Sequence, residues 1–131
     1  MRNDRSGLRA LYAALRDGDA VGLLPDQVPP ARSGEYAPFF GRDALTMTLA
    51  HRLIEKFEPC VVLCYAQRLP KAAGFRLGFE RLPDVERAAN LHESLVAMNG
   101  AIERIVSLDP AQYQWEYRRF RRPRTASERI Y

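Results

Sequence analysis

Long apolar runs, histidine and cysteine are all scarce in this sequence. No stretch approaches the roughly 18 consecutive apolar residues of a membrane-spanning helix, and charged and polar residues follow Met1 where a signal peptide would be hydrophobic. Two histidines and two cysteines stand at no spacing that suits a metal ion, and there is no glycine-rich phosphate loop. We therefore expect no membrane anchor in this stretch of chain, no metal site and no cofactor.

The two cysteines also bear on the chemical setting. Cys60 and Cys64 share a predicted apolar strand, residues 60–67, on which both side chains would face the same way. Along one strand they are too far apart to form a disulfide bond with each other. We expect two buried, reduced thiols and hence a cytoplasmic setting.

The composition suits one domain with a modest core, because 47% of the 131 residues are hydrophobic and 27% are charged. The apolar pattern changes along the chain between helical and strand spacing, which predicts an α/β fold with a mixed sheet of at least three strands flanked by helices. We expect helices at residues 6–17, 44–57, 85–108 and 111–120, and strands at residues 20–24, 60–67 and 75–82. In the last helix, Tyr113 and Tyr117 are expected to close the core, and Trp115 either does the same or lies at the level of lipid headgroups.

Residues 22–41 form the strongest candidate for a functional site. The strand predicted at residues 20–24 ends at Pro25, because proline cannot donate a hydrogen bond within a sheet. Asp26 and Gln27 then stand at the carboxyl end of that strand, where ligands of open α/β sheets bind. The alternative is that Asp26 only caps the following turn, which is a common role for aspartate.

Four motifs occur together in this chain. They read RNDRSGL at residues 2–8, GLLPDQ at residues 22–27, PFFG at residues 38–41 and QYQWEYRRF at residues 112–120. In order and spacing they resemble the late acyltransferases of lipid A biosynthesis, the lauroyl and myristoyl transferase family of the Gram-negative envelope. The resemblance covers nearly the whole chain but only the C-terminal part of a family member.

The resemblance implies an enzyme that moves a fatty acyl chain from an acyl carrier protein thioester to a phosphorylated glycolipid. It also implies a place at the cytoplasmic face of the bacterial inner membrane, with this part of the chain bound peripherally. Loop position and the family pattern assign substrate-binding roles to six residues: Arg5 and Arg32 at phosphate groups, Asp26 and Gln27 at the acceptor or in orienting the loop, and Phe39 and Phe40 at the wall of an acyl-chain trough.

The catalytic signature of that family is missing here. It consists of a histidine followed, after four residues, by an aspartate or glutamate that orients the histidine to deprotonate the acceptor hydroxyl. After His51 and His92, the positions that require the acid hold Lys56 and Ala97. We therefore assign no catalytic residue within this chain. The alternative to the C-terminal part of an enzyme is a non-catalytic lipid-binding remnant or accessory module.

Positive charge gathers at the end of the chain. Residues 118–131 hold six arginines against one acidic residue, Glu128, and so account for the whole of the net charge of +4. We expect residues 1–123 to form the acyltransferase part and residues 124–131 a basic tail that meets a membrane surface, although a solvated tail explains the charge equally well. A nucleic-acid-binding domain is a third function class that only these arginines support, and we expect no nucleic-acid partner.

An incomplete sheet carries a further expectation. If neighbouring strands of the family fold are absent, strand edges and apolar surface stay open, and the chain should associate with itself. Sedimentation as a monomer would contradict this expectation.

Overall fold

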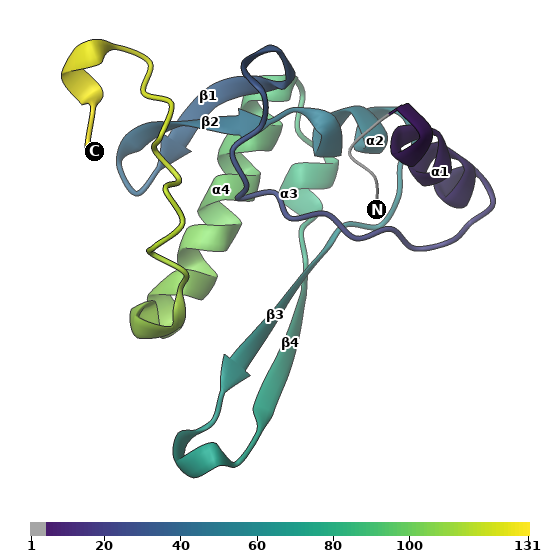
Figure 1. Ribbon diagram of the computed structural model, residues 1–131. Helices are drawn as coiled ribbons and strands as arrows, with labels where there is room; N and C mark the ends of the chain where they lie inside the picture. The colour runs from purple at the N-terminus through teal and green to yellow at the C-terminus, as the bar shows by residue number, and fades with distance from the viewer. Residues whose placement is uncertain (1–4) are drawn as a thin grey trace.

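Helices and strands are combined in this chain, which confirms the predicted α/β class (Figure 1). The computed structural model describes residues 5–131, with side chains from Ser6 onward. The helices are α1 (Arg5–Arg16), α2 (Leu49–Phe57), α3 (Pro83–Glu86) and α4 (Leu91–Leu108). The strands are β1 (Gly34–Phe39), β2 (Arg42–Met47), β3 (Val62–Arg68) and β4 (Phe75–Arg81). Single 3-10 turns are η1 (Ala31–Ser33), η2 (Pro70–Ala72), η3 (Pro110–Gln112) and η4 (Ala126–Glu128).

The described strands form two separate antiparallel hairpins, β1–β2 and β3–β4, so the single mixed sheet predicted from the sequence is wrong. In the first hairpin Phe39 pairs with Arg42 across the turn. The two turn residues, Phe40 and Gly41, have positive φ angles of 48° and 73°. Positive φ at both central positions is typical of the tight turns that join two twisted strands.

The first hairpin also displaces part of a predicted helix. The sequence predicts a helix from residue 44, whereas β2 runs to Met47 and α2 begins only at Leu49. Leu45 stands at helical spacing from Leu49, but its backbone pairs with Tyr36 of β1. Pairing with the preceding strand of the hairpin has overridden the helical spacing, since the conformation of a strand depends strongly on its neighbours.

The core lies between the β1–β2 hairpin and the helices that cover it. The helix α4 packs on β1, and α2 and α3 both contact α4. Phe39 and Ala44 of the hairpin and Leu95 of α4 are completely buried. The core cluster consists of Phe39, Ala44, Ala50, Ile54, Leu82, Val85, Met98, Ala101, Ile102 and Val106.

The helix predicted at residues 85–108 is two helices. The first, α3, ends at Glu86, and α4 begins after Asn90, whose side-chain oxygen accepts a hydrogen bond from the backbone N–H of Glu93 (3.0 Å). The carboxylate of Glu93 accepts in turn from the backbone N–H of Ala89 (3.1 Å). This reciprocal capping starts a new helix at residue 91.

Residues 20–24 form no strand, contrary to the prediction. A strand needs a neighbour for its backbone hydrogen bonds, and neither of the described hairpins includes these residues. Leu24 is 63% exposed. Asp26 and Gln27 therefore follow an irregular segment and not the end of a strand.

The β3–β4 hairpin projects from the rest of the molecule (Figure 1). Large apolar side chains on it are between 50% and 69% exposed: Val62, Phe75, Leu77 and Phe79. Cys60 and Cys64 are free, as expected, but both are exposed, so the predicted burial of the thiols is wrong. The reason is that a two-stranded ribbon cannot bury both of its faces, whereas the prediction assumed a central strand of a larger sheet.

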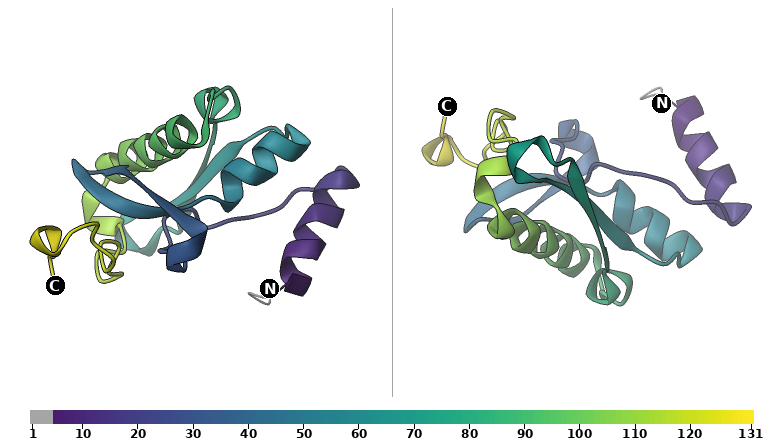
Figure 2. Two further views of the ribbon diagram at one scale, coloured as in Figure 1. Left: turned by 90° about the horizontal axis from the view of Figure 1, so that it is seen from above. Right: turned by 90° about the horizontal axis from the view of Figure 1, so that it is seen from below.

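The helix α1 and the turn η4 lie at opposite ends of the molecule (Figure 2). At one end α1 packs beside α2, where the rings of Tyr12 and Phe57 meet edge to face with their centroids 5.3 Å apart. At the other end the C-terminal segment runs along the first hairpin, and the hydroxyl of Tyr36 donates to the carbonyl oxygen of Pro123 (3.1 Å). No helix within residues 5–131 is both long enough and apolar enough to cross a membrane.

Candidate functional site

The C-terminal segment is held against β2 by a buried arginine. Arg119 is 3% exposed, and its guanidinium donates hydrogen bonds to the carbonyl oxygen of Leu45 (2.7 Å) and to Oγ1 of Thr46 (2.8 Å). The same guanidinium lies over the ring of Phe39, 5.3 Å from its centroid. These contacts replace the helix predicted at residues 111–120, of which only the turn η3 is helical.

Thr46 joins Arg119 to the helix α4. Its hydroxyl donates to the carbonyl oxygen of Ala44 (3.0 Å) and accepts a hydrogen bond from Nδ2 of Asn99 (3.2 Å). Asn99 also donates to the carbonyl oxygen of Pro38 (2.8 Å). One buried polar network therefore connects the C-terminal segment, both strands of the first hairpin and α4.

Asp26 and the loop around it are bonded to the same C-terminal segment. The hydroxyl of Tyr113 donates to Oδ2 of Asp26 (3.2 Å), and the backbone N–H of Val28 donates to the hydroxyl oxygen of Tyr117 (2.8 Å). The guanidinium of Arg121 donates to the carbonyl oxygen of Val28 (3.2 Å). We define the Asp26 cluster as Asp26, Tyr113, Tyr117 and Arg119.

Burial and charge shift two pKa values within the Asp26 cluster. Burial raises the pKa of Tyr113 above its ordinary value, and the negative charge of Asp26 raises it further. Burial lowers the pKa of Arg119, whereas Tyr113 and Asp26 oppose that change. At neutral pH the tyrosine is a neutral hydrogen-bond donor, and the arginine is a cation near the Asp26 carboxylate.

The carboxylate of Asp26 does more than cap its own turn, because it bonds to a side chain 87 residues further along the chain. Asp26 is only partly buried, so the cluster holds a negative group at a fixed place near the surface. Such a group can accept hydrogen bonds from the hydroxyls of a polar ligand. The cluster contains no histidine, and we assign it no catalytic role.

Two other expected site residues, Gln27 and Arg32, take no part in the hydrogen bonds of the Asp26 cluster. Gln27 is exposed beside Asp26, and Arg32 is exposed on the turn η1. The side chain of Arg5 lies outside the described part of the structure. The substrate contacts assigned to these residues stay predictions.

Phe39 and Phe40 belong to an aromatic group at the turn of the first hairpin. Phe39 is completely buried, whereas Phe40 is 39% exposed. The ring centroid of Phe40 lies 4.8 Å from that of Phe39 and 5.8 Å from that of Trp115. Phe40 and Trp115 therefore present apolar surface to solvent, while Phe39 supports them from the core. The acyl-chain contact assigned to Phe39 and Phe40 stays a prediction.

A histidine and a carboxylate meet elsewhere on the surface. Nδ1 of His92, at the start of α4, lies 3.4 Å from Oε1 of Glu35 in β1, and the two side chains are 55% and 43% exposed. A motif search at fixed spacing cannot find this pair, because its members are far apart in the sequence. The pair is open to solvent and takes no part in the Asp26 cluster, and we assign it no catalytic role. Within residues 5–131, no three His, Cys, Asp or Glu side chains gather closely enough to hold a metal ion.

Sequence reasoning missed the most connected residue of the site. The sequence presents Arg119 only as part of the basic C-terminal run, and Tyr113 and Tyr117 as residues that close the core. All three stand in the motif at residues 112–120 that carries the family resemblance. The motif itself is the signal in the sequence that could have identified these residues, because a polar side chain within an aromatic motif often makes buried hydrogen bonds.

Comparison with known proteins agrees with the motifs. The sequence matches the family model described as bacterial lipid A biosynthesis acyltransferase over residues 1–122. It is similar to the lipid A biosynthesis lauroyltransferase of Escherichia coli (strain K12), with 30% identity over 120 residues, which cover 90% of this chain and 39% of that protein.

Two further relatives show the same pattern. The lipid A biosynthesis palmitoleoyltransferase of Escherichia coli (strain K12) is 29% identical over 119 residues, covering 89% of this chain and 38% of the relative. A lipid A biosynthesis acyltransferase of Haemophilus influenzae is 25% identical over 131 residues, covering 98% of this chain and 42% of the relative. The chain thus spans about two fifths of the length of these curated relatives. With the family model matched over nearly its whole length, the chain belongs to the bacterial lipid A biosynthesis acyltransferase family.

Proposed function

We propose that this chain is the C-terminal portion of an enzyme that transfers a fatty acyl chain from acyl carrier protein to a phosphorylated glycolipid acceptor. The observation that carries the proposal is the family match over residues 1–122. Relatives named as a lauroyltransferase and a palmitoleoyltransferase support a fatty acyl chain as the transferred group. We place the reaction at the cytoplasmic face of the bacterial inner membrane, with the basic residues 124–131 toward anionic lipid.

The reaction makes three demands on the protein. The acceptor hydroxyl attacks the thioester carbonyl, an ester bond forms, the carbon–sulfur bond breaks, and the thiol leaves with a proton. The protein must supply a base for the hydroxyl proton, fixed polar groups for the glycolipid and an apolar surface for the acyl chain. In our proposal Asp26, Gln27 and Arg32 help to position the acceptor. Phe40, supported by Phe39, contacts the acyl chain.

A second candidate is a lipid-binding module without catalytic activity. It is favoured by Lys56 and Ala97, which occupy the positions where the family signature needs an acid. The surface pair of His92 and Glu35 does not substitute for that signature, because both side chains are open to water. Such a module would hold the glycolipid but leave it unchanged.

An acyl-transfer assay with the purified protein, including any polypeptide that the same gene encodes ahead of residue 1, separates the two candidates. Labelled acyl carrier protein thioester and a phosphorylated glycolipid are added, and both the labelled ester product and the binding of glycolipid are measured. Labelled product supports the enzyme, and binding without product supports the module. A chain that neither binds the glycolipid nor forms product overturns both candidates.

Single substitutions test the assigned acceptor contacts. Asp26→Asn keeps the shape of the side chain but removes its charge, and we expect the affinity for the glycolipid to fall about tenfold. Asp19→Asn, at an exposed position, is the matched control and should leave the affinity unchanged. Arg32→Ala is expected to weaken binding of the phosphorylated acceptor but not of its dephosphorylated form. Unchanged binding by Arg32→Ala would remove Arg32 from the site.

A further inference from the structure

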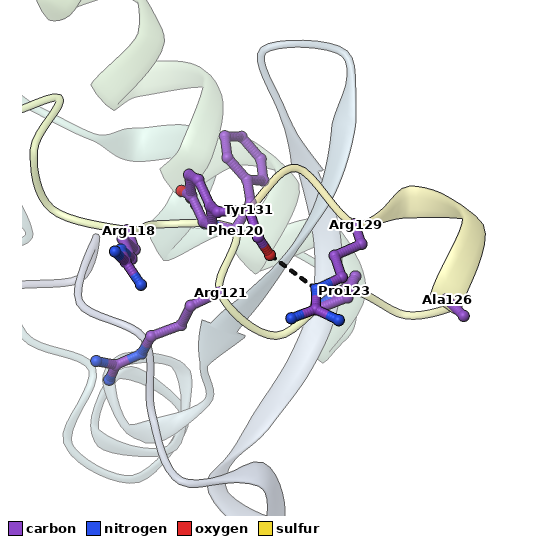
Figure 3. Close-up of a pocket in the computed structure, with 7 residues that line it drawn as sticks. All are labelled: Arg118, Phe120, Arg121, Pro123, Ala126, Arg129 and Tyr131. Atoms are coloured by element: carbon purple, nitrogen blue, oxygen red, sulfur yellow. Dashed lines mark hydrogen bonds between the residues drawn. The ribbon is translucent and has the colours of Figure 1, made fainter.

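A hollow of about 440 Å³ opens in the C-terminal segment (Figure 3). Five of the residues that line it define what we call the arginine pocket: Arg118, Phe120, Arg121, Arg129 and Tyr131. In Figure 3, Arg118 and Arg121 lie on one side of the two rings, and Arg129 lies on the other. The volume falls within the range of small-molecule sites.

We propose that the arginine pocket binds a phosphate group, either on a lipid headgroup or as free phosphate. Three positive charges around one hollow repel one another unless negative charge offsets them. Among the ion pairs of residues 5–131, none involves Arg118, Arg121 or Arg129. No Asp or Glu side chain of residues 5–131 is thus paired with the pocket. Nε of Arg129 lies 2.8 Å from the main-chain oxygen of Tyr131, the last residue of the sequence, so Arg118 and Arg121 carry the positive charge that is left without an anionic partner.

The nearby carboxylates are engaged elsewhere. Oε2 of Glu128 accepts hydrogen bonds from the backbone N–H groups of Arg124 (3.1 Å) and Thr125 (3.4 Å). The guanidinium of Arg124 pairs in turn with Asp43 of β2 (3.1 Å). Neither carboxylate is paired with an arginine of the pocket, which leaves the pocket free for an external anion.

Contacts with the protein hold the pocket arginines without using up their donors. The guanidinium of Arg118 lies 5.7 Å from the ring centroid of Tyr131, and that of Arg121 donates to the carbonyl oxygen of Val28 (3.2 Å). Nε of Arg129 donates to the backbone oxygen of Tyr131 (2.8 Å), the bond drawn in Figure 3. Each guanidinium has five N–H donors, so most of them stay available to a ligand.

Phosphate fits this pocket better than other anionic ligands. The planar fork of arginine matches the oxygen atoms of phosphate, and a doubly charged group offsets more than one arginine. The rings of Phe120 and Tyr131 add an apolar wall against which the first carbons of a lipid can lie. A nucleic acid would need a groove that follows several phosphates and free ring faces for its bases, whereas the ring of Tyr131 already faces Arg118.

Binding measurements on the full chain test the proposal. The probes are inorganic phosphate, followed by calorimetry, and vesicles of phosphatidylcholine with or without phosphatidic acid, followed by co-sedimentation. The double substitution Arg118→Gln with Arg129→Gln removes two pocket charges, and we expect it to weaken binding about tenfold or more. The control, Arg52→Gln with Arg122→Gln, removes the same charge from exposed residues that do not line the pocket.

Each outcome decides the proposal. Loss of binding in the pocket variant alone supports it. Binding of inorganic phosphate then identifies a site for free phosphate, and binding only to vesicles with phosphatidic acid identifies a headgroup site. Equal loss in both variants, or no binding of either probe, overturns it. The headgroup outcome rests on the proposed contact of residues 124–131 with anionic lipid. Phosphate binding and acyl transfer are measured separately, so failure of one is distinguishable from failure of the other.

Discussion

Arg119 ties the C-terminal segment to the rest of the protein. Burial of its charge is costly, and its hydrogen bonds to Leu45 and Thr46 offset that cost. Lysine keeps the charge but lacks the planar fork that reaches both acceptors. We expect Arg119→Lys to lower the free energy of unfolding by about 2 kcal/mol, measured by urea denaturation.

The neighbouring arginine provides the control for this substitution. Arg118 is exposed, and Arg118→Lys should change the free energy of unfolding by less than about 0.5 kcal/mol. If the two substitutions had equal effects, the buried hydrogen bonds of Arg119 would not be the cause.

Tyr113 should make stability depend on alkaline pH. Its pKa is raised in the folded protein, so folding favours the neutral phenol. The stabilisation is complete below the ordinary tyrosine pKa of about 10 and is lost as pH rises from there toward the folded value, because only the unfolded chain ionises readily. We expect the free energy of unfolding to fall above about pH 10 less steeply in Tyr113→Phe than in the unchanged protein. Parallel pH profiles from denaturant titrations would contradict this role.

At the scale of the structural elements, the β3–β4 hairpin carries several large apolar side chains that are exposed. Phe75, Leu77 and Phe79 are each more than 60% exposed, and the ribbon has unpaired strand edges. Such surface favours contact with a second copy of the chain. We expect the protein to sediment above its monomer mass and the double substitution Leu77→Thr with Phe79→Thr to shift it toward the monomer.

A control substitution on another element tests whether any exposed apolar-to-polar change would alter sedimentation. Val96 is exposed on α4, and Val96→Thr should leave sedimentation unchanged. A monomeric parent protein at all concentrations would show that the hairpin surface does not drive association.

For the protein as a whole, the boundary at residue 123 can be tested by removing residues 124–131. This removes the ion pair of Arg124 with Asp43, whose side chains are 63% and 31% exposed. Partly exposed pairs contribute little, so we expect the free energy of unfolding to fall by at most about 1 kcal/mol. Phosphate binding should weaken in the same protein, because Arg129 and Tyr131 of the arginine pocket are lost. A fall of several kcal/mol in denaturant titrations would show that these residues belong to the folded core.

Local patterns in the sequence predicted several helices and strands close to their observed bounds. The helix α1, the end of α2 at Phe57 and the strand β4 lie close to where apolar spacing and helix-stop residues put them. The motif at residues 112–120 pointed to the right family through its residue types and spacing. These features depend on residues a few positions apart, which a single sequence displays directly.

The positions of the helices and strands relative to one another depend on contacts that the local sequence pattern does not predict. The positive φ of Phe40 lets residues 42–47 pair with β1, which removed the first turn of a predicted helix. The segment 20–24 lacked a neighbouring strand and stayed irregular. The bond of Tyr113 to Asp26 likewise joins residues 87 positions apart. The sequence alone therefore determined the family and the local helical and strand periods. The Asp26 cluster and the burial of Arg119 against β2 were decided by tertiary structure, because their hydrogen bonds form only when segments far apart in the sequence meet.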